Sequence, residues 1–331
     1  MKFRGVSPMI KIYYYDALQN RIIHDVEIRP EELLANKDSL LWVDLFNFTD
    51  DEATRIARLF DFHSLSVEDC LHYSPRAKVD NYEEYYFFTL HALRYEEESD
   101  EEISLEQLNV YLGKNYVVTL HRRTLPTLGR MARDCLANRF EVMKKGPDFF
   151  LYSTLDGITD MYFPVLDRIN QRVEELEDDL YEQPTKEITE EFLSLKKTIL
   201  SMRRAIMPQK RMFANVNGQY SFIIDEENKP YYLDLVDHIE RIIDSIDSFG
   251  ALVDGALATY YSVISARTNE SIRVLTVIST IFMPLTFVTG FFGMNVPLPA
   301  QQSGVSTLVI TAGLLGVSLY MYLIFRLNKW L

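Results

Sequence analysis

Two uncharged apolar runs near the C-terminal end limit what this chain can fold into. The first is VLTVISTIFMPLTFVTG, Val274 to Gly290, and the second is VSTLVITAGLLGVSLYMYLIF, Val305 to Phe325. Each run has about 20 residues, so as a helix it spans roughly 30 Å of hydrocarbon. A buried helical hairpin in a soluble core is the alternative. Two adjacent runs of this length predict a transmembrane domain over 272–331, with helices at about 272–292 and 304–326.

The charges that flank the two runs predict how they cross the membrane. Arg267 and Arg273 stand before the first run and Arg326 and Lys329 after the second, whereas residues 291–304 contain no Lys or Arg. Cytoplasmic flanks of membrane helices carry the excess of positive charge. We therefore expect a multi-pass protein of the plasma (inner) membrane with both termini in the cytoplasm and an outer loop at 293–303.

The rest of the chain is strongly acidic, with 48 acidic and 34 basic residues among 331 and a formal net charge of −14. Nucleic-acid binding needs a basic surface, so no nucleic-acid partner is expected, and cations or basic partners are favoured instead. Only Cys70 and Cys135 are present, which is typical of a reducing compartment. We find no zinc-protease, phosphate-loop or nucleophile-elbow motif, so the sequence does not predict an enzyme.

The cytoplasmic part divides into three predicted regions. Residues 1–123 alternate short β-branched and aromatic segments, from MIKIYYYD to NYVVTLH, with two amphipathic helices near 50–61 and 64–73, which predicts an α/β domain. Residues 124–230 are predicted to be helical: one helix covers roughly 124–140, and a long pair at about 148–182 and 186–214 is interrupted at Pro184 and bent at Pro164. Residues 231–271 are predicted to form a stalk.

The stalk has no proline between Tyr231 and Met283, so one helix is expected over about 231–292. Its apolar residues recur at spacings of three and four, which is typical of a self-associating seam. The seam comprises Val236, Ile239, Ile243, Ile246, Val253, Leu257, Tyr260 and Ile264. The pattern therefore predicts a homo-oligomer with parallel stalks embedded in membrane lipid.

The same spacing continues into the first membrane helix on a face of hydroxyl, amide, small and flexible side chains. The face comprises Asn269, Ile272, Thr276, Ser279, Met283, Thr286 and Gly290. Ordinary helix packing in lipid is the alternative, because small and hydroxyl residues favour close packing there. If this face points to the oligomer axis, the helices enclose a polar, uncharged path.

The residues Gly293, Met294 and Asn295 follow that face at its outer end. An amide oxygen can accept hydrogen bonds from the water shell that Mg²⁺ keeps, and a carboxylate would hold the ion more tightly. A ring of asparagines is thus a candidate selectivity filter for a hydrated divalent cation. An ordinary turn between two membrane helices is the alternative.

The segment TNESIRVLTVISTIFMPLTFVTGFFGMN, Thr268 to Asn295, resembles the CorA family of magnesium channels. VEDCLH, PRAKVDNYEEYYFFTL, FFLYSTLDGITDMYF and YYLDLVDH extend the resemblance over nearly the whole chain. It implies a homopentamer with a CorA-like cytoplasmic funnel, in which the first membrane helices line the pore. It also implies Mg²⁺ influx, with Co²⁺ and Ni²⁺ as further candidate ions, driven by the membrane potential. Asn295 would form the outer selectivity ring, and Ile272, Leu275 and Met283 would lie near hydrophobic constrictions.

The resemblance further implies regulatory Mg²⁺ ions between the cytoplasmic domains of neighbouring subunits. Asp69 and Asp234 correspond to ligands of one ion, and Glu68 and Asp156 are candidates for a second. From the residues alone, Asp69 and Asp234 are ordinary surface acids. Intracellular Mg²⁺ bound there would close the channel.

Two departures and two alternatives accompany this interpretation. LATYY lacks the acid that a family member carries at the inner pore mouth, and VPLPAQQSG lacks the acid that often follows the signature. Met294 favours magnesium, because zinc-transporting relatives of the same fold replace this methionine. A Zn²⁺, Co²⁺ or Ni²⁺ carrier with proton coupling stays open, since His238 follows Asp234 by four residues and suits a softer metal. A coiled-coil adaptor would need neither Asn295 nor the hydroxyl face.

Overall fold

The computed structural model describes residues 9–95, 103–182, 185–213, 224–294, 304–328 and 330. The chain divides into two compact units, which are described separately. The first unit comprises Met1–Asp179 and Glu187–Asp254, and the second comprises Leu180–Lys186 and Gly255–Leu331. Asn295, the proposed filter residue, lies outside the described residues, as does Pro184.

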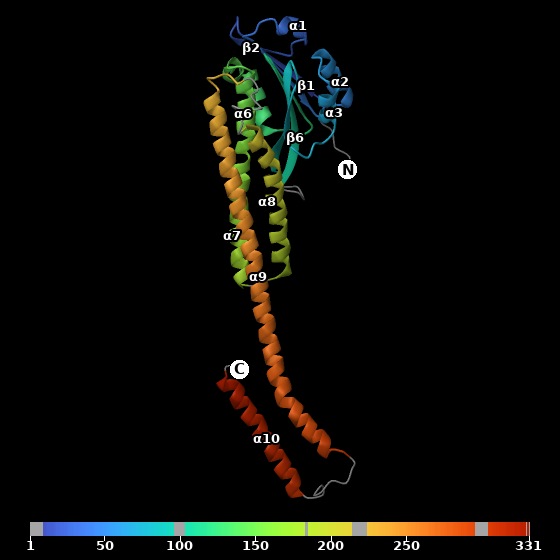
Figure 1. Ribbon diagram of the computed structural model, residues 1–331, viewed down its shortest axis with the longest axis vertical. Helices are drawn as coiled ribbons and strands as arrows, with labels where there is room; N and C mark the ends of the chain where they lie inside the picture. The colour runs from blue at the N-terminus through green and yellow to red at the C-terminus, as the bar shows by residue number, and fades with distance from the viewer. Residues whose placement is uncertain are drawn as a thin grey trace. The chain divides into compact units, whose positions relative to one another are not determined.

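A seven-stranded sheet forms the centre of the first unit (Figure 1). Its strands are β1 (Met9–Asp16), β2 (Arg21–His24), β3 (Leu40–Phe46), β4 (Lys78–Asn81), β5 (Tyr85–Tyr95), β6 (Ile103–Gly113) and β7 (Tyr116–His121). Their order is β2-β1-β3-β7-β6-β5-β4, and β3 and β7 are the parallel pair. Six of these strands match the predicted segments. The edge strand β4 was not predicted, because KVDN is short and mostly polar.

Helices cover both faces of this sheet, as side-chain alternation along β3 shows. Leu41, Val43 and Leu45 face one side and join the buried cluster that includes Ile56 of α2 (Asp50–Leu59) and residues of α3 (Ser64–Leu71). Trp42 faces the other side, where its ring centroid lies 4.9 Å from that of Phe150 in α6 (Pro147–Asp160). Figure 1 shows α3 and α6 on opposite faces. The α/β class of this region is confirmed.

The two helices predicted near 50–61 and 64–73 are confirmed as α2 and α3. Thr49 caps α2: its hydroxyl accepts from the Glu52 backbone N–H, and the Glu52 carboxylate accepts from the Thr49 backbone N–H. This reciprocal pair satisfies two donors that the first turn of a helix leaves free. The remaining short helices are α1 (Pro30–Leu33), α4 (Pro126–Leu136) and α5 (Glu141–Lys144). The helix predicted over 124–140 is therefore shorter than expected and is followed by a separate turn.

The long helix predicted over 148–182 is two helices in the structure. α6 ends at Asp160 and α7 (Tyr162–Glu182) begins after Met161. Proline has no N–H, so Pro164 cannot donate to the carbonyl of Asp160, and the hydrogen-bond ladder is interrupted there. The partner helix of the predicted pair is confirmed as α8 (Lys186–Phe213).

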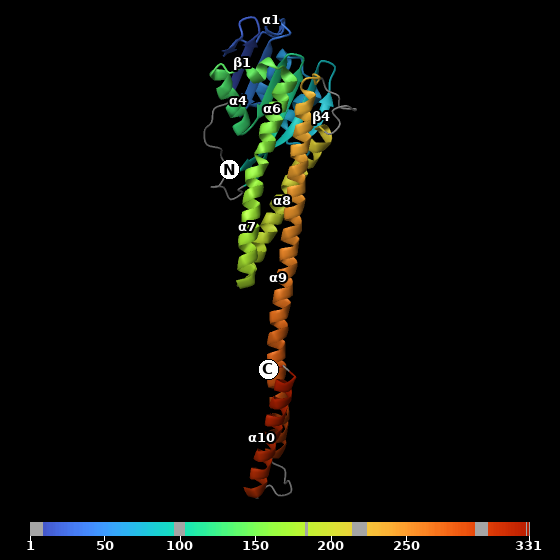
Figure 2. The same cartoon turned by 90° about the vertical axis from the view of Figure 1, so that its left-hand side faces the viewer.

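The single long helix predicted from 231 to 292 is confirmed as α9 (Lys229–Phe292). In the first unit its apolar seam is filled by the chain itself, since Ile246 and Val253 are fully buried. Ion pairs from α8 flank that seam, namely Lys210–Glu240, Arg203–Asp247 and Lys196–Asp254. Figures 1 and 2 both show α8 alongside α9. The prediction that this part of the α9 seam packs against another copy of the chain was therefore wrong, because it packs against α8 of the same chain.

The second unit contains the end of α9 and the apolar helix α10 (Gly304–Leu327). Both helices are long and apolar enough to cross a membrane, and 6% and 0% of the residues in their most apolar windows are buried within the chain. A hairpin in a soluble core would bury most of these residues. The buried-hairpin alternative therefore does not describe this chain, and the two predicted membrane helices are confirmed as elements of the fold.

Candidate metal centre and ion path

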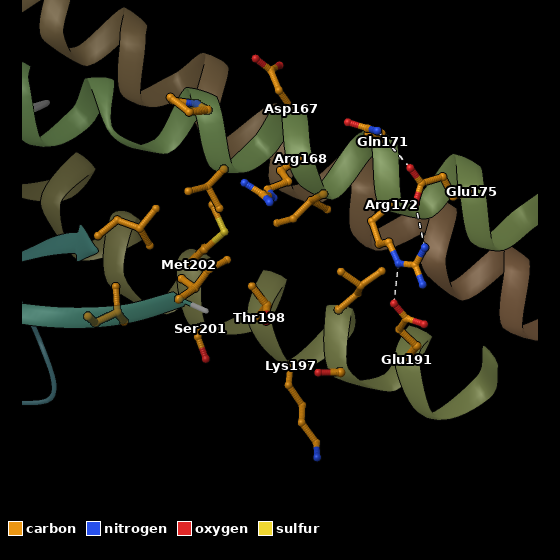
Figure 3. Close-up of a pocket in the computed structure, with 18 residues that line it drawn as sticks. Asp167, Arg168, Gln171, Arg172, Glu175, Glu191, Lys197, Thr198, Ser201 and Met202 are labelled. Carbon is orange, nitrogen blue, oxygen red and sulfur yellow. Dashed lines mark hydrogen bonds and ion pairs between the residues drawn. The ribbon is translucent and has the colours of Figure 1, made fainter. Parts of the chain in front are cut away.

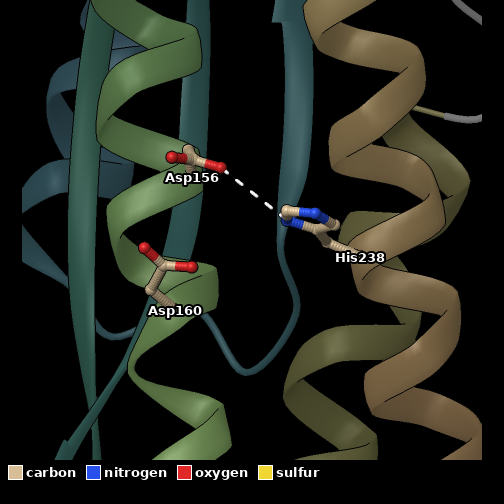
Figure 4. A group of neighbouring side chains, drawn as sticks. All are labelled: Asp156, Asp160 and His238. Carbon is tan, nitrogen blue, oxygen red and sulfur yellow. Dashed lines mark ion pairs between the residues drawn. The ribbon is translucent and has the colours of Figure 1, made fainter.

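Three ligand-type side chains of the first unit converge between α6 and α9. Asp156 and Asp160 stand one turn apart on α6, and His238 faces them from α9 (Figure 4). One ligand atom from each residue lies within 4.8 Å of the others. This separation allows one cation to be shared among them.

The position of α6 depends on a glycine next to Asp156. A Cβ atom on Gly157 would lie 2.5 Å from Cγ2 of Thr127 in α4. Real Cβ atoms do not come so close to another carbon, so only glycine permits this approach of the two helices. The close contact of α6 with α4 therefore fixes where the Asp156 carboxylate stands.

The imidazole of His238 lies between carboxylates of two helices. Its Nε2 atom is 3.5 Å from Oδ2 of Asp234, and its Nδ1 atom is 3.9 Å from Oδ1 of Asp156. Among the described residues Nδ1 has no hydrogen-bond partner, although it is shielded from solvent. A shielded ring nitrogen that faces carboxylates is available for a metal ion or a proton.

Crowded negative charge marks the same place. Burial raises the pKa of Asp156 above its ordinary value; the neighbouring Asp160 and Asp234 raise it further, and His238 and Arg130 oppose the shift. A bound divalent cation would remove this repulsion. The cluster offers two carboxylates and an imidazole, a set that suits Co²⁺, Ni²⁺ or Zn²⁺ as well as Mg²⁺, which prefers oxygen ligands.

The predicted regulatory acids fall into two separate places within one chain. Asp156 and Asp234 both adjoin His238, whereas Glu68 and Asp69 lie on α3, on the opposite face of the sheet. Glu68 is exposed. A single subunit therefore does not bring Asp69 and Asp234 together. Asp160 was missed by the sequence analysis, although its spacing of four from Asp156 on a helix places both acids on one face.

The Asp69 carboxylate already has a cationic partner. Oδ2 of Asp69 lies 2.6 Å from Nζ of Lys78, and the same Nζ lies 2.8 Å from Oδ2 of Asp80. Burial lowers the pKa of Lys78, but the hydrogen bonds and charges of the two aspartates outweigh burial and raise it overall. Lys78 is thus a protonated ammonium group at neutral pH.

The predicted pore face of α9 is exposed in the chain, including Ile272, Leu275 and Met283 at 55%, 63% and 78%. The hydroxyl of Thr276 on this face donates to the Ile272 carbonyl at 2.7 Å. This bond uses the hydroxyl proton and leaves oxygen lone pairs directed away from the helix. The Thr276 hydroxyl can therefore act as an acceptor toward water.

The first membrane helix ends close to the predicted filter. α9 stops at Phe292, and the Gly293 N–H still donates to the Thr289 carbonyl at 2.9 Å. A Cβ atom on Gly293 would lie 3.1 Å from that carbonyl oxygen, so a glycine suits this tight turn. Met294 is half exposed. Two of the predicted filter residues therefore follow the end of the helix directly, and the third, Asn295, lies beyond the described part.

A cavity of about 1060 Å³ lies elsewhere in the first unit, between α7 and α8 (Figure 3). Its lining includes Val165, Met202 and an ion-paired group of Arg172, Glu175 and Glu191. Three acids and three bases line the cavity in all (Asp167, Glu175 and Glu191; Arg168, Arg172 and Lys197), so its charges balance and provide little net attraction for an ion. This cavity is not a candidate metal centre.

An α/β domain with a metal-type cluster, followed by a continuous helix and a second apolar helix, defines a membrane protein that handles metal cations. The family model of the CorA-like Mg²⁺ transporter proteins matches residues 37–327. The chain belongs to this family.

Individual relatives agree with the assignment. The chain is 32% identical to the cobalt/magnesium transport protein CorA of Thermotoga maritima, over 91% of this chain and 87% of the relative. The complete structure of the CorA magnesium transporter from Methanocaldococcus jannaschii matches with a TM-score of 0.84 at 21% identity, covering 99% and 100% of the two chains. The ZntB cytoplasmic domain from Vibrio parahaemolyticus matches with a TM-score of 0.61 at 13% identity, over 79% of this chain and 99% of that domain. Both structural matches show the fold alone, so the fold does not choose between metals.

Proposed function

We propose that the protein is a divalent cation channel that admits Mg²⁺, with Co²⁺ and Ni²⁺ as further candidate ions. The observation that carries the proposal is the exposed face of α9, which presents hydroxyl, amide and small side chains along an apolar membrane helix. Membership of the CorA-like Mg²⁺ transporter family supports the same function. The membrane potential supplies the driving force, since a divalent cation gains about 4.6 kcal/mol per 100 mV, twice the single-charge value.

The ion passes with water still bound to it. Mg²⁺ holds its waters tightly, and these waters are hydrogen-bond donors. The amide oxygen of Asn295 and the hydroxyl oxygens of Thr276, Ser279 and Thr286 accept from that shell without a charge that would trap the ion. Ile272, Leu275 and Met283 form hydrophobic constrictions that close the path when it is dry.

One α9 face cannot enclose a path, so the channel is a homo-oligomer, and we propose a pentamer. Each subunit contributes its α9 face to a central pore in the plasma (inner) membrane. Both chain ends lie in the cytoplasm, as the flanking Arg and Lys residues indicate. Within each subunit we keep the division into an α/β domain (1–123), a helical region (124–230), a stalk (231–271) and a transmembrane domain (272–331).

Intracellular Mg²⁺ closes the channel by binding between cytoplasmic domains. Asp69 of one subunit and Asp234 of its neighbour hold one ion, and Glu68 and Asp156 serve a second. The placement of Asp69 and Asp234 on opposite faces of one chain supports a site shared between chains. When Mg²⁺ leaves, the acids repel one another and the interface loosens, which lets the constrictions widen.

A second candidate function is a Zn²⁺, Co²⁺ or Ni²⁺ carrier with proton coupling. The observation that favours it is the group of Asp156, Asp160 and His238, because an imidazole nitrogen suits these metals. Met294 favours magnesium. Ion flux decides between the two.

The test measures cation flux into proteoliposomes under an imposed inside-negative potential. The purified protein should admit Mg²⁺ without ATP, and Asn295→Ala should abolish this flux while assembly stays intact. Asn328→Ala, the same substitution just beyond α10, is the matched control and should conduct normally. Near-normal uptake through a correctly assembled Asn295→Ala protein would remove the filter proposal. Flux restricted to Zn²⁺, or flux that requires a proton gradient at zero potential, would establish the carrier instead.

The sensor has a separate test in protease protection of the stalk. Wild-type protein should resist cleavage in Mg²⁺ and lose that resistance in chelator. The double variant Asp69→Lys/Asp234→Lys places fixed positive charges among the remaining acids and should depend much less on Mg²⁺. Equal Mg²⁺-dependent protection of both proteins would exclude these two acids as the sensor.

A further inference from the structure

Lys78 stands between two carboxylates at the edge of the sheet. It is the first residue of the edge strand β4, and its Nζ atom lies 2.6 Å from Asp69 and 2.8 Å from Asp80. The side chains of Lys78, Asp69 and Asp80 are 36%, 32% and 39% exposed, so water and ions can reach the group. The proposed Mg²⁺ ligand Asp69 therefore already holds a cation that belongs to its own chain.

The backbone that carries Asp69 is fixed in place. Nε2 of Gln107 in β6 donates to the Asp69 carbonyl at 3.1 Å and to the His72 carbonyl at 3.3 Å. Oε1 of Gln107 accepts from the Ser74 N–H at 2.7 Å. The C-terminal end of α3 is thus tied to the sheet near Lys78. The ammonium group contacts Oδ2 of Asp69, so a cation that binds this oxygen must displace the ammonium group.

We propose that Lys78 is a tethered competitor of the divalent cation at Asp69. It sets the Mg²⁺ concentration at which the cytoplasmic interface closes, and it discriminates against monovalent cations. This inference rests on the proposed function, in which Asp69 is a ligand of the regulatory ion.

The discrimination follows from charge. The lysine ammonium is a compact single positive charge, so a K⁺ or Na⁺ ion that replaced it would bring no additional charge to Asp69. A Mg²⁺ ion brings twice the charge to the same oxygen, and its attraction to the carboxylate is correspondingly stronger. A site with a resident ammonium therefore responds to divalent cations and ignores the monovalent cations of the surrounding solution.

The experiment titrates protease protection of the stalk with MgCl₂ in the full-length, detergent-solubilised protein. Lys78→Met should lower the Mg²⁺ concentration at half protection by about three- to tenfold, as expected for the loss of partly exposed ion pairs. Lys78→Arg keeps the charge and should stay within about twofold of wild type. The matched control is Lys114→Met, which removes a lysine that pairs with Glu84 at 2.8 Å in the same domain. It should also stay within about twofold.

Two further arms keep the inference open to refutation. Asp80→Asn leaves Lys78 with Asp69 as its partner, so the competitor is held more firmly and the half-protection concentration should rise. This arm decides the matter if Lys78→Met does not fold. In KCl without Mg²⁺, Lys78→Met should show partial protection that wild type lacks.

The outcomes separate this inference from the proposed sensor. An unchanged Mg²⁺ midpoint in Lys78→Met, or in Asp80→Asn if the first variant is unfolded, overturns the competition. It leaves the sensor intact as long as wild type is protected and Asp69→Lys/Asp234→Lys is not. Equal shifts in Lys78→Met and Lys114→Met also overturn it, because the effect would then be one of overall charge. Absence of Mg²⁺-dependent protection in wild type removes the sensor and the inference together.

Discussion

Replacement of Asp44 by alanine should destabilise the α/β domain more than any surface substitution. The Asp44 carboxylate accepts from the Thr119 hydroxyl at 2.6 Å and lies 3.1 Å from Nε2 of His121. Thr119 in turn accepts from the indole N–H of Trp42 at 2.9 Å. His121 also has the Arg123 carbonyl 2.6 Å from its Nδ1 atom. Both ring nitrogens face acceptors, so the imidazole fits this place best as a doubly protonated cation.

The expected magnitude follows from burial. The side chains of His121 and Asp44 are 5% and 9% exposed, and removal of one partner from a buried pair costs about 3–5 kcal/mol. For a chain of this size that loss lowers the melting temperature by roughly 6–20 °C, at about 2–4 °C per kcal/mol. The cost is largest at low pH, where the imidazole stays charged.

The pH dependence has a definite sign. Burial lowers the pKa of His121, but the hydrogen bond and charge of Asp44 outweigh burial, and the net shift is upward from 6.5. A raised folded-state pKa adds stability that is fully present below the unfolded value and is lost as pH rises through the folded value. Wild-type stability should therefore fall as pH increases above about 6.5, and the Asp44→Ala protein should lack this slope.

Tryptophan fluorescence provides the assay, because the chain has two tryptophans and Trp42 belongs to the network. Thermal melts at several pH values in a Trp330→Phe background report on the domain alone. Asp247→Ala is the matched control: it removes an aspartate 2.7 Å from Arg203 that is 48% exposed. Its cost should stay within about 1 kcal/mol. A loss below about 1 kcal/mol in Asp44→Ala at pH 6, or an equal loss in both variants, would refute the buried-pair reasoning.

Three other outcomes are expected. Mg²⁺ flux should follow membrane potential and concentration, with about 4.6 kcal/mol per 100 mV available to the ion, and flux that continues against both gradients would contradict this. His238→Ala should raise the Co²⁺ concentration at half protection of the stalk by about tenfold or more. The Mg²⁺ concentration at half protection should rise much less, since Mg²⁺ prefers oxygen ligands, and equal rises for the two metals would remove His238 as a ligand. Gly157→Val should lower stability by about 1–3 kcal/mol in the thermal melt followed by Trp42 fluorescence, because its Cβ would meet Thr127. It should also weaken protection by Mg²⁺, because it moves Asp156. An unchanged melt would show that α4 and α6 can separate freely.

Much of the fold follows from local patterns in the sequence. Strands with β-branched and aromatic residues, the capping residue Thr49 and the uncharged runs all act over short stretches, and the elements they predict are present. The element that packs against a long apolar seam is not predicted by such local patterns. Ile246 and Val253 would suit a second copy of the chain as well as α8, since spacing defines a face and does not identify what covers it.

The candidate site was predictable only in part, for the same reason. The residues that resemble the CorA signature lie in one short segment, whereas the acid cluster joins two helices about 80 residues apart in sequence. Helical spacing could have added Asp160 to Asp156, but only the packing of α6 against α9 brings His238 to both. The pairing of Asp69 with Lys78 likewise depends on the turn from α3 into β4, which no periodicity encodes.

The distribution of charge along α9 bears on both the proposed sensor and the proposed ion path. Carboxylates bind a divalent cation firmly, which suits a sensor that must stay occupied while internal Mg²⁺ is sufficient. A conducting path has the opposite requirement, because an ion that binds too firmly does not leave. The positions along the chain fit both requirements of the proposed function: Asp234 stands near the start of α9, and no charged residue occurs from Val274 to Ser303. The same helix, α9, carries both Asp234 and the uncharged face.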